Sequence, residues 1–219
     1  MLHYLQNLIE ALDFTSLGEA AIRVAAVFLC LTVHETCHGL AAYVLGDPTA
    51  KQRHRLSLNP LRHIDWFGLL MMFTAGFGWA KPVPVNPRYF RRPKQGMAIT
   101  ALAGPVSNFL LALLAVFVGS LLWRYAPASR VLAALFSFLV MEVAPLSIGL
   151  GLFNLLPIPP LDGSKILAMF LPDGAYLRLM RYERYGIIVL LMLSWFGLTG
   201  NLISGAIMNA YQLLINLFF

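Results

Sequence analysis

The chain has 219 residues, of which 59% are hydrophobic and 12% are charged, and its mean hydropathy is +0.72. This composition excludes a fold solvated by water on all sides and predicts a polytopic membrane protein. The net charge of +6 is not accompanied by any nucleic-acid-binding module, so we interpret it as a signal of membrane topology and lipid contact and expect no nucleic-acid partner.

The apolar segments predict an all-α polytopic membrane protein. A spanning helix needs roughly 20 predominantly apolar residues. Five candidate spans lie at 20–45, 97–123, 131–157, 185–200 and 201–219. No repeat or linker divides the chain, so we expect about five transmembrane helices in a single membrane-embedded domain, 1–219.

The first 16 residues place Glu10 and Asp13 among leucines. The basic start of a secretory signal peptide is missing from this stretch. We therefore expect an interfacial amphipathic helix that stays in the mature chain.

The first span carries His34-Glu35-Thr36-Cys37-His38, an H-E-x-x-H pattern. Residues four apart lie one above the other on a helix face, so the two imidazoles can share a zinc ion while Glu35 reaches a water on that ion. Polar groups at membrane depth are candidates for function by default. The pattern therefore predicts metal-assisted hydrolysis.

Glycines and prolines interrupt the helical pattern throughout residues 46–96. Within this region, residues 66–80 are apolar for fifteen residues but have basic stretches on both sides, so they cannot cross the membrane as one helix and return. We expect a re-entrant or interfacial β-like hairpin here. The alternating prolines of residues 81–85 suggest an extended, edge-like strand.

Basic residues set the predicted orientation. Nine fall in the 46–96 loop and four follow the third span, whereas three fall on the other side of the membrane. By the positive-inside rule, both rich segments are cytoplasmic. Five spans then place the N-terminus outside, and the main basic loop and the opening of the active site face the cytoplasm.

A catalytic zinc ion usually takes three protein ligands and keeps one position for water. The third span ends in a proline-rich stretch before Asp162-Gly163, on the side toward which the first span carries its histidines. We therefore predict Asp162 as the third ligand. Considered alone, an Asp-Gly pair would more often be a turn or a helix N-cap.

Four other polar residues have open roles. Cys30 lies one turn from His34, and we interpret it as a packing residue, with metal contact as the alternative. His63 and Asp65 are either a pair on a surface loop or residues that hydrogen-bond to the metal-ligating side chains. Glu142 lies in mid-span, where it is either protonated or paired with Arg23 or Arg124, with a catalytic role as a minor alternative.

The second span contains Gly104, Pro105 and Asn108. We interpret Gly104 and Pro105 as packing residues, because glycine permits close approach of helices. Asn108 lies one turn on from Gly104 and would hydrogen-bond either across helices or to a substrate backbone.

Three separated motifs resemble those of the site-2 protease family of intramembrane zinc metallopeptidases, in particular its compact members without a PDZ domain. They are the H-E-x-x-H motif at 34–38, the G-P-x-x-N motif at 104–108, and the N-x-x-P-x-x-x-x-D-G motif at 154–163. Residues 46–50 and 77–86 also read like segments of the compact subgroup. The basic Arg53-His54-Arg55 stretch departs from the pattern of the family. This departure affects the expected substrate contacts and not the catalytic residues.

The resemblance implies that His34, His38 and Asp162 bind one zinc ion per chain. It further implies that Glu35 is the general base and acid and that Asn154 lies near the scissile carbonyl. The expected partners are transmembrane protein substrates and the lipid bilayer, in a bacterial or archaeal cell membrane.

A peptide bond inside a helix is shielded by its own turn, so a substrate must unwind before water attacks. Residues 81–86 could then pair with it as an added strand, which would make Val83 and Val85 substrate contacts; an irregular connector is equally expected.

Two other functions compete with a protease. A metal or solute transporter normally distributes polar residues over several spans, whereas here one helical turn holds most of them. A catalytically inert relative would be expected to lose a ligand or the base, and all four residues are present.

Overall fold

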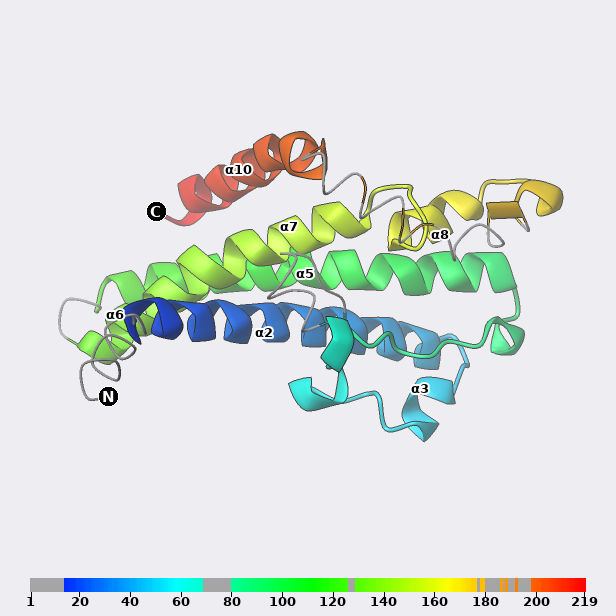
Figure 1. Ribbon diagram of the computed structural model, residues 1–219, viewed down its shortest axis with the longest axis horizontal. Coiled ribbons are helices and arrows are strands. Elements are labelled where there is room, and N and C mark those ends of the chain that lie inside the picture. The colour runs from blue at the N-terminus through cyan, green and yellow to red at the C-terminus, as the bar shows by residue number, and fades with distance from the viewer. Residues whose placement is uncertain are drawn as a thin grey trace, which may run out of the picture.

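The computed structural model describes residues 14–68, 80–125, 129–176, 178–179, 186, 188, 192 and 198–219. Within these residues every regular element is helical (Figure 1). The predicted all-α architecture is therefore confirmed for this part of the chain.

Three helices are long and apolar enough to cross a membrane. They are α2 (Phe14–Val44), α5 (Pro93–Trp123) and a composite helix formed by α6 (Arg130–Ser137), the π-helical η4 (Phe138–Val143) and α7 (Ala144–Asn154). They correspond to the spans predicted at 20–45, 97–123 and 131–157. Figure 1 shows α2, α5 and α7 side by side along the long axis, with α5 packed against both of the others.

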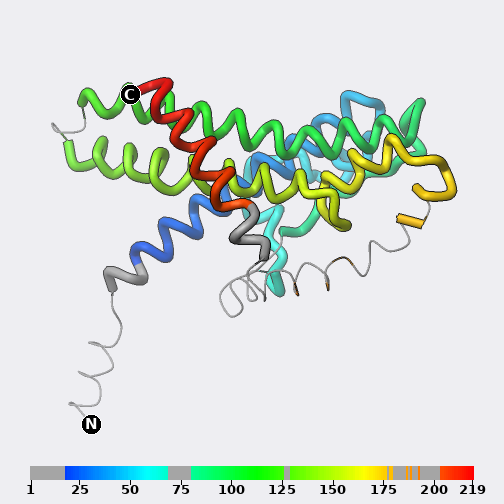
Figure 2. The backbone as a smooth tube through the Cα atoms, turned by 90° about the horizontal axis from the view of Figure 1, so that it is seen from above, coloured from blue at the N-terminus to red at the C-terminus, as the bar shows by residue number. Residues whose placement is uncertain are grey.

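The two remaining predicted spans have different outcomes. Most of the segment 185–200 lies outside the described residues. The segment 201–219 corresponds to α10 (Leu198–Phe218), whose apolar part Ile203–Phe218 is shorter than a usual span. Helix α10 packs against α7 and crosses the bundle obliquely in Figure 2. Most of the interfacial helix predicted at 1–16 also lies outside the described residues.

The helices approach each other through small side chains. The core cluster consists of Ala26, Cys30, Ala112, Ala115, Val116, Val143, Ala144 and Ile148. Small residues allow close backbone approach, which favours helix association in lipid, where burial of apolar surface provides little driving force. Large apolar side chains such as Leu110 and Val131 are instead exposed, as expected of a surface that faces lipid.

Helix α2 ends at a glycine turn that returns the chain toward the middle of the helix. Gly46 has a φ of +104°, a conformation that glycine adopts without steric cost. The Gly46 N–H bonds to the Tyr43 carbonyl and the Asp47 N–H bonds to the Ala42 carbonyl, which is a Schellman motif. The short elements α3 (Thr49–Gln52), η1 (Pro60–Arg62) and η2 (Pro87–Tyr89) follow before α5 begins.

No strand is present at 80–86 in the structure, so the edge-like strand predicted at 81–85 is not formed. Within residues 80–86, two N–H groups donate to carboxylates instead of to a neighbouring strand. The Val83 N–H donates to Glu35, and the Asn86 N–H donates to Asp47. Proline supplies no N–H at positions 82 and 84. The hairpin predicted at 66–80 lies mostly outside the described residues and stays a prediction.

Glu142 lies in the π-helical segment of the composite span. Its Oε2 is 4.0 Å from Nε of Arg23 on α2, so Arg23 is the partner among the alternatives that the sequence left open. The Tyr211 hydroxyl of α10 donates to the Val140 carbonyl of the same π-helical segment, at 3.1 Å. The contact with Arg23 gives the carboxylate a structural partner away from the histidines, and the Tyr211 bond joins α10 to the same π-helical segment.

Candidate metal centre and active-site cavity

Three buried side chains from distant parts of the chain meet inside the helix bundle. The Nε2 atoms of His34 and His38 are 2.9 Å apart, and each is 3.1 Å from Oδ2 of Asp162. One ligand atom from each residue lies within 4.8 Å of the other two. Zinc binds nitrogen and oxygen at about 2.0–2.2 Å, so one ion fits this donor set. We call these three residues the metal trio.

The two histidines come together because α2 is continuous through residues 34–38. Asp162 arrives by a different route, since α7 ends at Asn154 and the chain loops back through Pro157. A Cβ at Gly163 would lie 2.1 Å from the Leu155 carbonyl oxygen, so glycine is what allows the loop to fold this tightly. Helix α8 (Asp162–Ala168) begins at Asp162 itself, so the alternative of an N-cap is wrong.

The outer nitrogens of the histidines differ in their partners. His38 Nδ1 lies 2.7 Å from the Thr100 carbonyl, to which its N–H donates. This bond fixes the tautomer that leaves the Nε2 lone pair for a metal. His34 Nδ1 is buried and has no partner among the described residues.

Gly104 on α5 makes room for both imidazoles. A Cβ at this position would lie 2.4 Å from His38 Cε1 and 2.6 Å from His34 Cε1. From the sequence, we predicted Gly104 to be a packing residue. The structure shows that it packs against the two predicted metal ligands, which sequence spacing alone does not reveal.

A cavity of about 350 Å³ opens beside the metal trio. Besides the trio, its lining consists of Glu35, Pro82, Val83, Val85, Met97, Thr100, Ala101, Asn154, Pro160 and Lys165. The structure therefore brings the predicted Glu35, Asn154, Val83 and Val85 to one place. Their roles stay predictions.

Asn108 is the exception among the predicted site residues. It is fully buried and is not part of the cavity lining. Its carbonyl accepts a hydrogen bond from Ser147 Oγ at 2.8 Å, whereas its amide group has no partner among the described residues. The hydrogen bond between α5 and α7 at Asn108 therefore uses the backbone carbonyl, and the amide side chain forms neither of the two predicted bonds among the described residues.

Lys165 also lines the cavity but is not among the residues predicted from the sequence. Its Nζ lies 3.8 Å from Oδ1 of Asp162, the oxygen that faces away from the histidines. Burial would raise the pKa of Asp162, but the approach of the two imidazoles outweighs burial and lowers it, which favours the ionised carboxylate. The only signal for Lys165 was its position three residues after Asp162.

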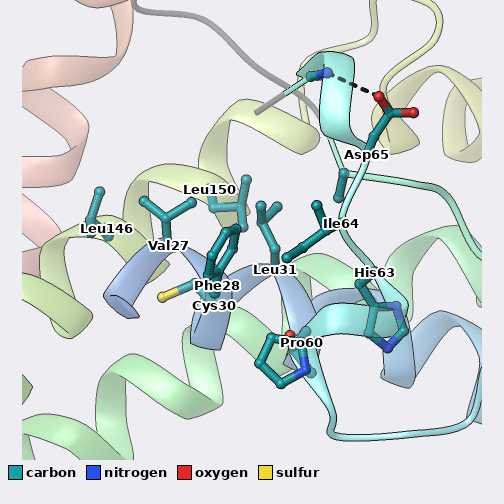
Figure 3. A pocket seen from close by; sticks show the side chains of 13 residues that line it. Val27, Phe28, Cys30, Leu31, Pro60, His63, Ile64, Asp65, Leu146 and Leu150 are labelled. Atoms are coloured by element: carbon teal, nitrogen blue, oxygen red, sulfur yellow. Dashed lines mark hydrogen bonds between the residues drawn. The ribbon is translucent and has the colours of Figure 1, made fainter. Parts of the chain in front are cut away.

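The other candidates lie apart from the metal trio. Cys30 Sγ donates to the Val143 carbonyl at 3.8 Å, which agrees with a packing role. His63 Nε2 donates to the Ser57 carbonyl at 2.8 Å, and Asp65 accepts bonds from the N–H groups of Phe67 and Gly68. Figure 3 shows Cys30, His63 and Asp65 around a second cavity of about 160 Å³ between α2, α7 and the loop.

We predict that Gly104→Ala lowers zinc retention, because the added methyl displaces the imidazoles. Overpacking typically costs about 1–3 kcal/mol of stability. The matched control is Gly119→Ala on the same helix, where a Cβ would lie 2.2 Å from Val140 but away from the histidines. Both variants should melt at lower temperature in detergent, and only Gly104→Ala should lose zinc, measured by mass spectrometry after mild chelation. Equal zinc retention in the two variants would contradict this assignment.

Comparison with known proteins identifies the family. Residues 125–195 match the model described as "Peptidase family M50". The chain is 42% identical over 175 residues to "Putative zinc metalloprotease YwhC" of Bacillus subtilis (strain 168), covering 78% of each chain. It is 31% identical over 182 residues to "Putative zinc metalloprotease Rip2" of Mycobacterium tuberculosis (strain ATCC 25618 / H37Rv), covering 80% of this chain and 67% of that protein.

The protein of the same name from Mycolicibacterium smegmatis (strain ATCC 700084 / mc(2)155) is 28% identical over 182 residues, with the same coverage of both chains. No solved structure matches the chain. The family and the names of these relatives imply zinc, and the metal trio offers a donor set that suits it. Because the similarity to YwhC extends over most of both proteins, the chain belongs to peptidase family M50, the family of the site-2 proteases.

Proposed function

We propose that the protein is an intramembrane endopeptidase that hydrolyses peptide bonds within or near the transmembrane segments of other membrane proteins. The observation that carries the proposal is the location of the metal trio and Glu35. They share one cavity, and three of the four lie on a helix that is long and apolar enough to cross a membrane. A peptide bond that reaches this cavity would come from a chain in the bilayer.

Zinc held by the metal trio would polarise the scissile carbonyl and lower the pKa of an attacking water. Glu35 is the proposed general base and acid. Its Oε2 accepts the Val83 N–H at 2.8 Å, and Oε1 has no partner in the described part of the chain. Oε1 is therefore the oxygen that would take the proton from water and return it to the leaving amine.

Asn154 is the proposed donor to the developing oxyanion. It lines the cavity, and one N–H of its amide donates to the Leu150 carbonyl at 2.9 Å. An amide has two N–H groups, so the second is available. The bond to Leu150 would hold the amide in a fixed orientation before substrate arrives, which is what electrostatic stabilisation of a transition state requires.

The extended segment 81–86 supports a proposed mode of substrate binding. An unwound substrate would add as a strand and form backbone hydrogen bonds with this segment. The Val83 N–H already bonds to Glu35. The proposed pairing therefore uses the Val85 N–H and carbonyl and the Val83 carbonyl, for which no partner exists among the described residues.

We also propose that the protein lies in the cell membrane with the cavity open to the cytoplasm and the N-terminus outside. Helix α2 ends and α5 begins at the same end of the bundle as the cavity. Exposed basic residues gather there: Lys51, Arg53, Arg88, Arg91 and Arg92. This distribution supports a cytoplasmic location under the positive-inside rule.

Glu35→Gln should abolish cleavage of a transmembrane reporter while one zinc per chain remains, because Glu35 is not a member of the metal trio. Loss of a positioned general base typically costs ~10²–10⁴-fold in rate. His34→Ala, His38→Ala and Asp162→Ala should instead lose zinc. A transporter or an inert relative would show no cleavage by the wild-type protein, and near-normal cleavage by Glu35→Gln would exclude the mechanism.

Asn154→Ala should keep zinc and KM and lose most of kcat, since one donor to an oxyanion contributes roughly 10²–10³-fold. Asn154→Asp should be no better, because a carboxylate repels the oxyanion. The measurements are steady-state kinetics and zinc content in detergent. Joint loss of zinc, thermal stability and activity would instead indicate that Asn154 braces the helices.

Single cysteines at Arg92 and Arg181 in a cysteine-free background should react with an impermeant reagent added from the cytoplasmic side. A cysteine at Ala128 should react from outside. Labelling is read by mass shift in intact cells and in inverted vesicles. Reaction of Arg92→Cys from outside would reverse the proposed orientation.

A further inference from the structure

Arg55 is a buried cation that has no role in the proposed proteolytic mechanism. It is 8% exposed, and no described carboxylate lies within 4.0 Å of its guanidinium. Charged side chains are rarely buried without compensating partners. The partners here are backbone carbonyls: Nη2 donates to the Lys81 carbonyl in a short hydrogen bond and approaches the Pro82 carbonyl at 3.4 Å.

The local backbone explains why Arg55 points inward. Helix α3 ends at Gln52, and His54 then adopts a left-handed conformation with a φ of +54°. This residue reverses the chain, so Arg53 is exposed to solvent whereas Arg55 is buried. Two arginines of the same loop therefore have different environments, which provides a matched control.

The backbone just before Val83 has few hydrogen bonds other than those from Arg55. Pro82 and Pro84 have no N–H to contribute to a ladder. The Lys81 N–H bonds to the His63 carbonyl at 2.9 Å. Arg55 adds the contacts to the next two carbonyls, so the backbone just before Val83 is held from both sides.

The backbone of Val83 connects this segment to Glu35. Its N–H donates to Glu35 Oε2 at 2.8 Å, so the position of the Val83 amide sets the rotation of the carboxylate. Burial lowers the pKa of Arg55, and the negative charge of Glu35 opposes that effect, so the two charged groups also attract each other across the segment. A general base must keep its free oxygen within hydrogen-bond reach of the proton it takes.

We propose that Arg55 is a positioning residue for the catalytic base: by binding the carbonyls of Lys81 and Pro82, it holds the Val83 N–H against Glu35 and fixes the carboxylate toward the metal trio. This proposal rests on the role assigned to Glu35 under the proposed function. It differs from a substrate contact, because Arg55 acts through the extended segment and is not part of the cavity lining.

Arg55→Met tests the proposal, because it removes the charge and the donors and keeps most of the side-chain length. We expect kcat for a transmembrane reporter to fall roughly 10–100-fold, as small misplacements of reacting groups do, with KM within about twofold of the wild-type value. Zinc content and melting temperature in detergent should stay near wild type. Arg55→Lys should recover much of kcat, because an ammonium group reaches one carbonyl. Arg53→Met, the exposed control, should change nothing.

Hydrogen exchange provides a readout that does not depend on proteolysis. In Arg55→Met, the amides of a peptide covering residues 81–90 should exchange faster than in the wild type, and in Arg53→Met they should not. If the wild-type protein cleaves no reporter, the proposed function fails, and this exchange difference still decides whether Arg55 holds the Val83 amide.

Three results would overturn the assignment. A raised KM with unchanged kcat would make Arg55 a substrate-binding residue. Unchanged exchange over residues 81–90 would show that the guanidinium does not hold the segment. Loss of zinc and of thermal stability in both Arg55→Met and Arg55→Lys would reduce its role to general support of the fold.

Discussion

The constraint on which this structure depends is the burial of ionisable groups inside an apolar helix bundle. A charge taken from water into a protein interior costs several kcal/mol unless it is paired or binds a metal. His34, His38 and Asp162 meet this constraint together, since a carboxylate and two imidazole nitrogens converge on one point that suits a zinc ion. The Thr100 carbonyl accepts the His38 N–H, and the Lys165 ammonium group lies near the second oxygen of Asp162.

Close helix packing makes this convergence possible. Helix α5 must approach α2 closely enough to supply the Thr100 carbonyl, and Gly104 allows this approach because a side chain there would occupy the space of the imidazoles. Gly163 has the same effect in the loop that carries Asp162. Both glycines belong to motifs that also contain polar residues, and their own contribution is the space left by the missing side chain.

The loop before α5 connects the metal centre to the proposed substrate path. Asp47 is fully buried and bonds to the Asn86 N–H at 2.6 Å, while Glu35 bonds to the Val83 N–H. Two carboxylates thus hold the extended segment along the end of α2 where the cavity opens. In the proposed mechanism, this arrangement would limit the motion of Glu35, the proposed base, and leave the Val85 backbone for an incoming chain, which would link proton transfer to substrate alignment.

The sequence by itself determined the membrane class, three helices, the zinc cofactor and the family, because hydropathy, four-residue spacing and motifs are local properties of a chain. It also indicated Asp162, which follows the proline-rich end of the third span, but it left the partner of Glu142 open between Arg23 and Arg124. Only the tertiary structure decided that Gly104 packs on the histidines, that Lys165 joins the cavity, that 81–86 is no strand and that Arg55 reaches the segment beside Glu35. These features depend on contacts between residues far apart in the chain, whose distances no sequence pattern encodes.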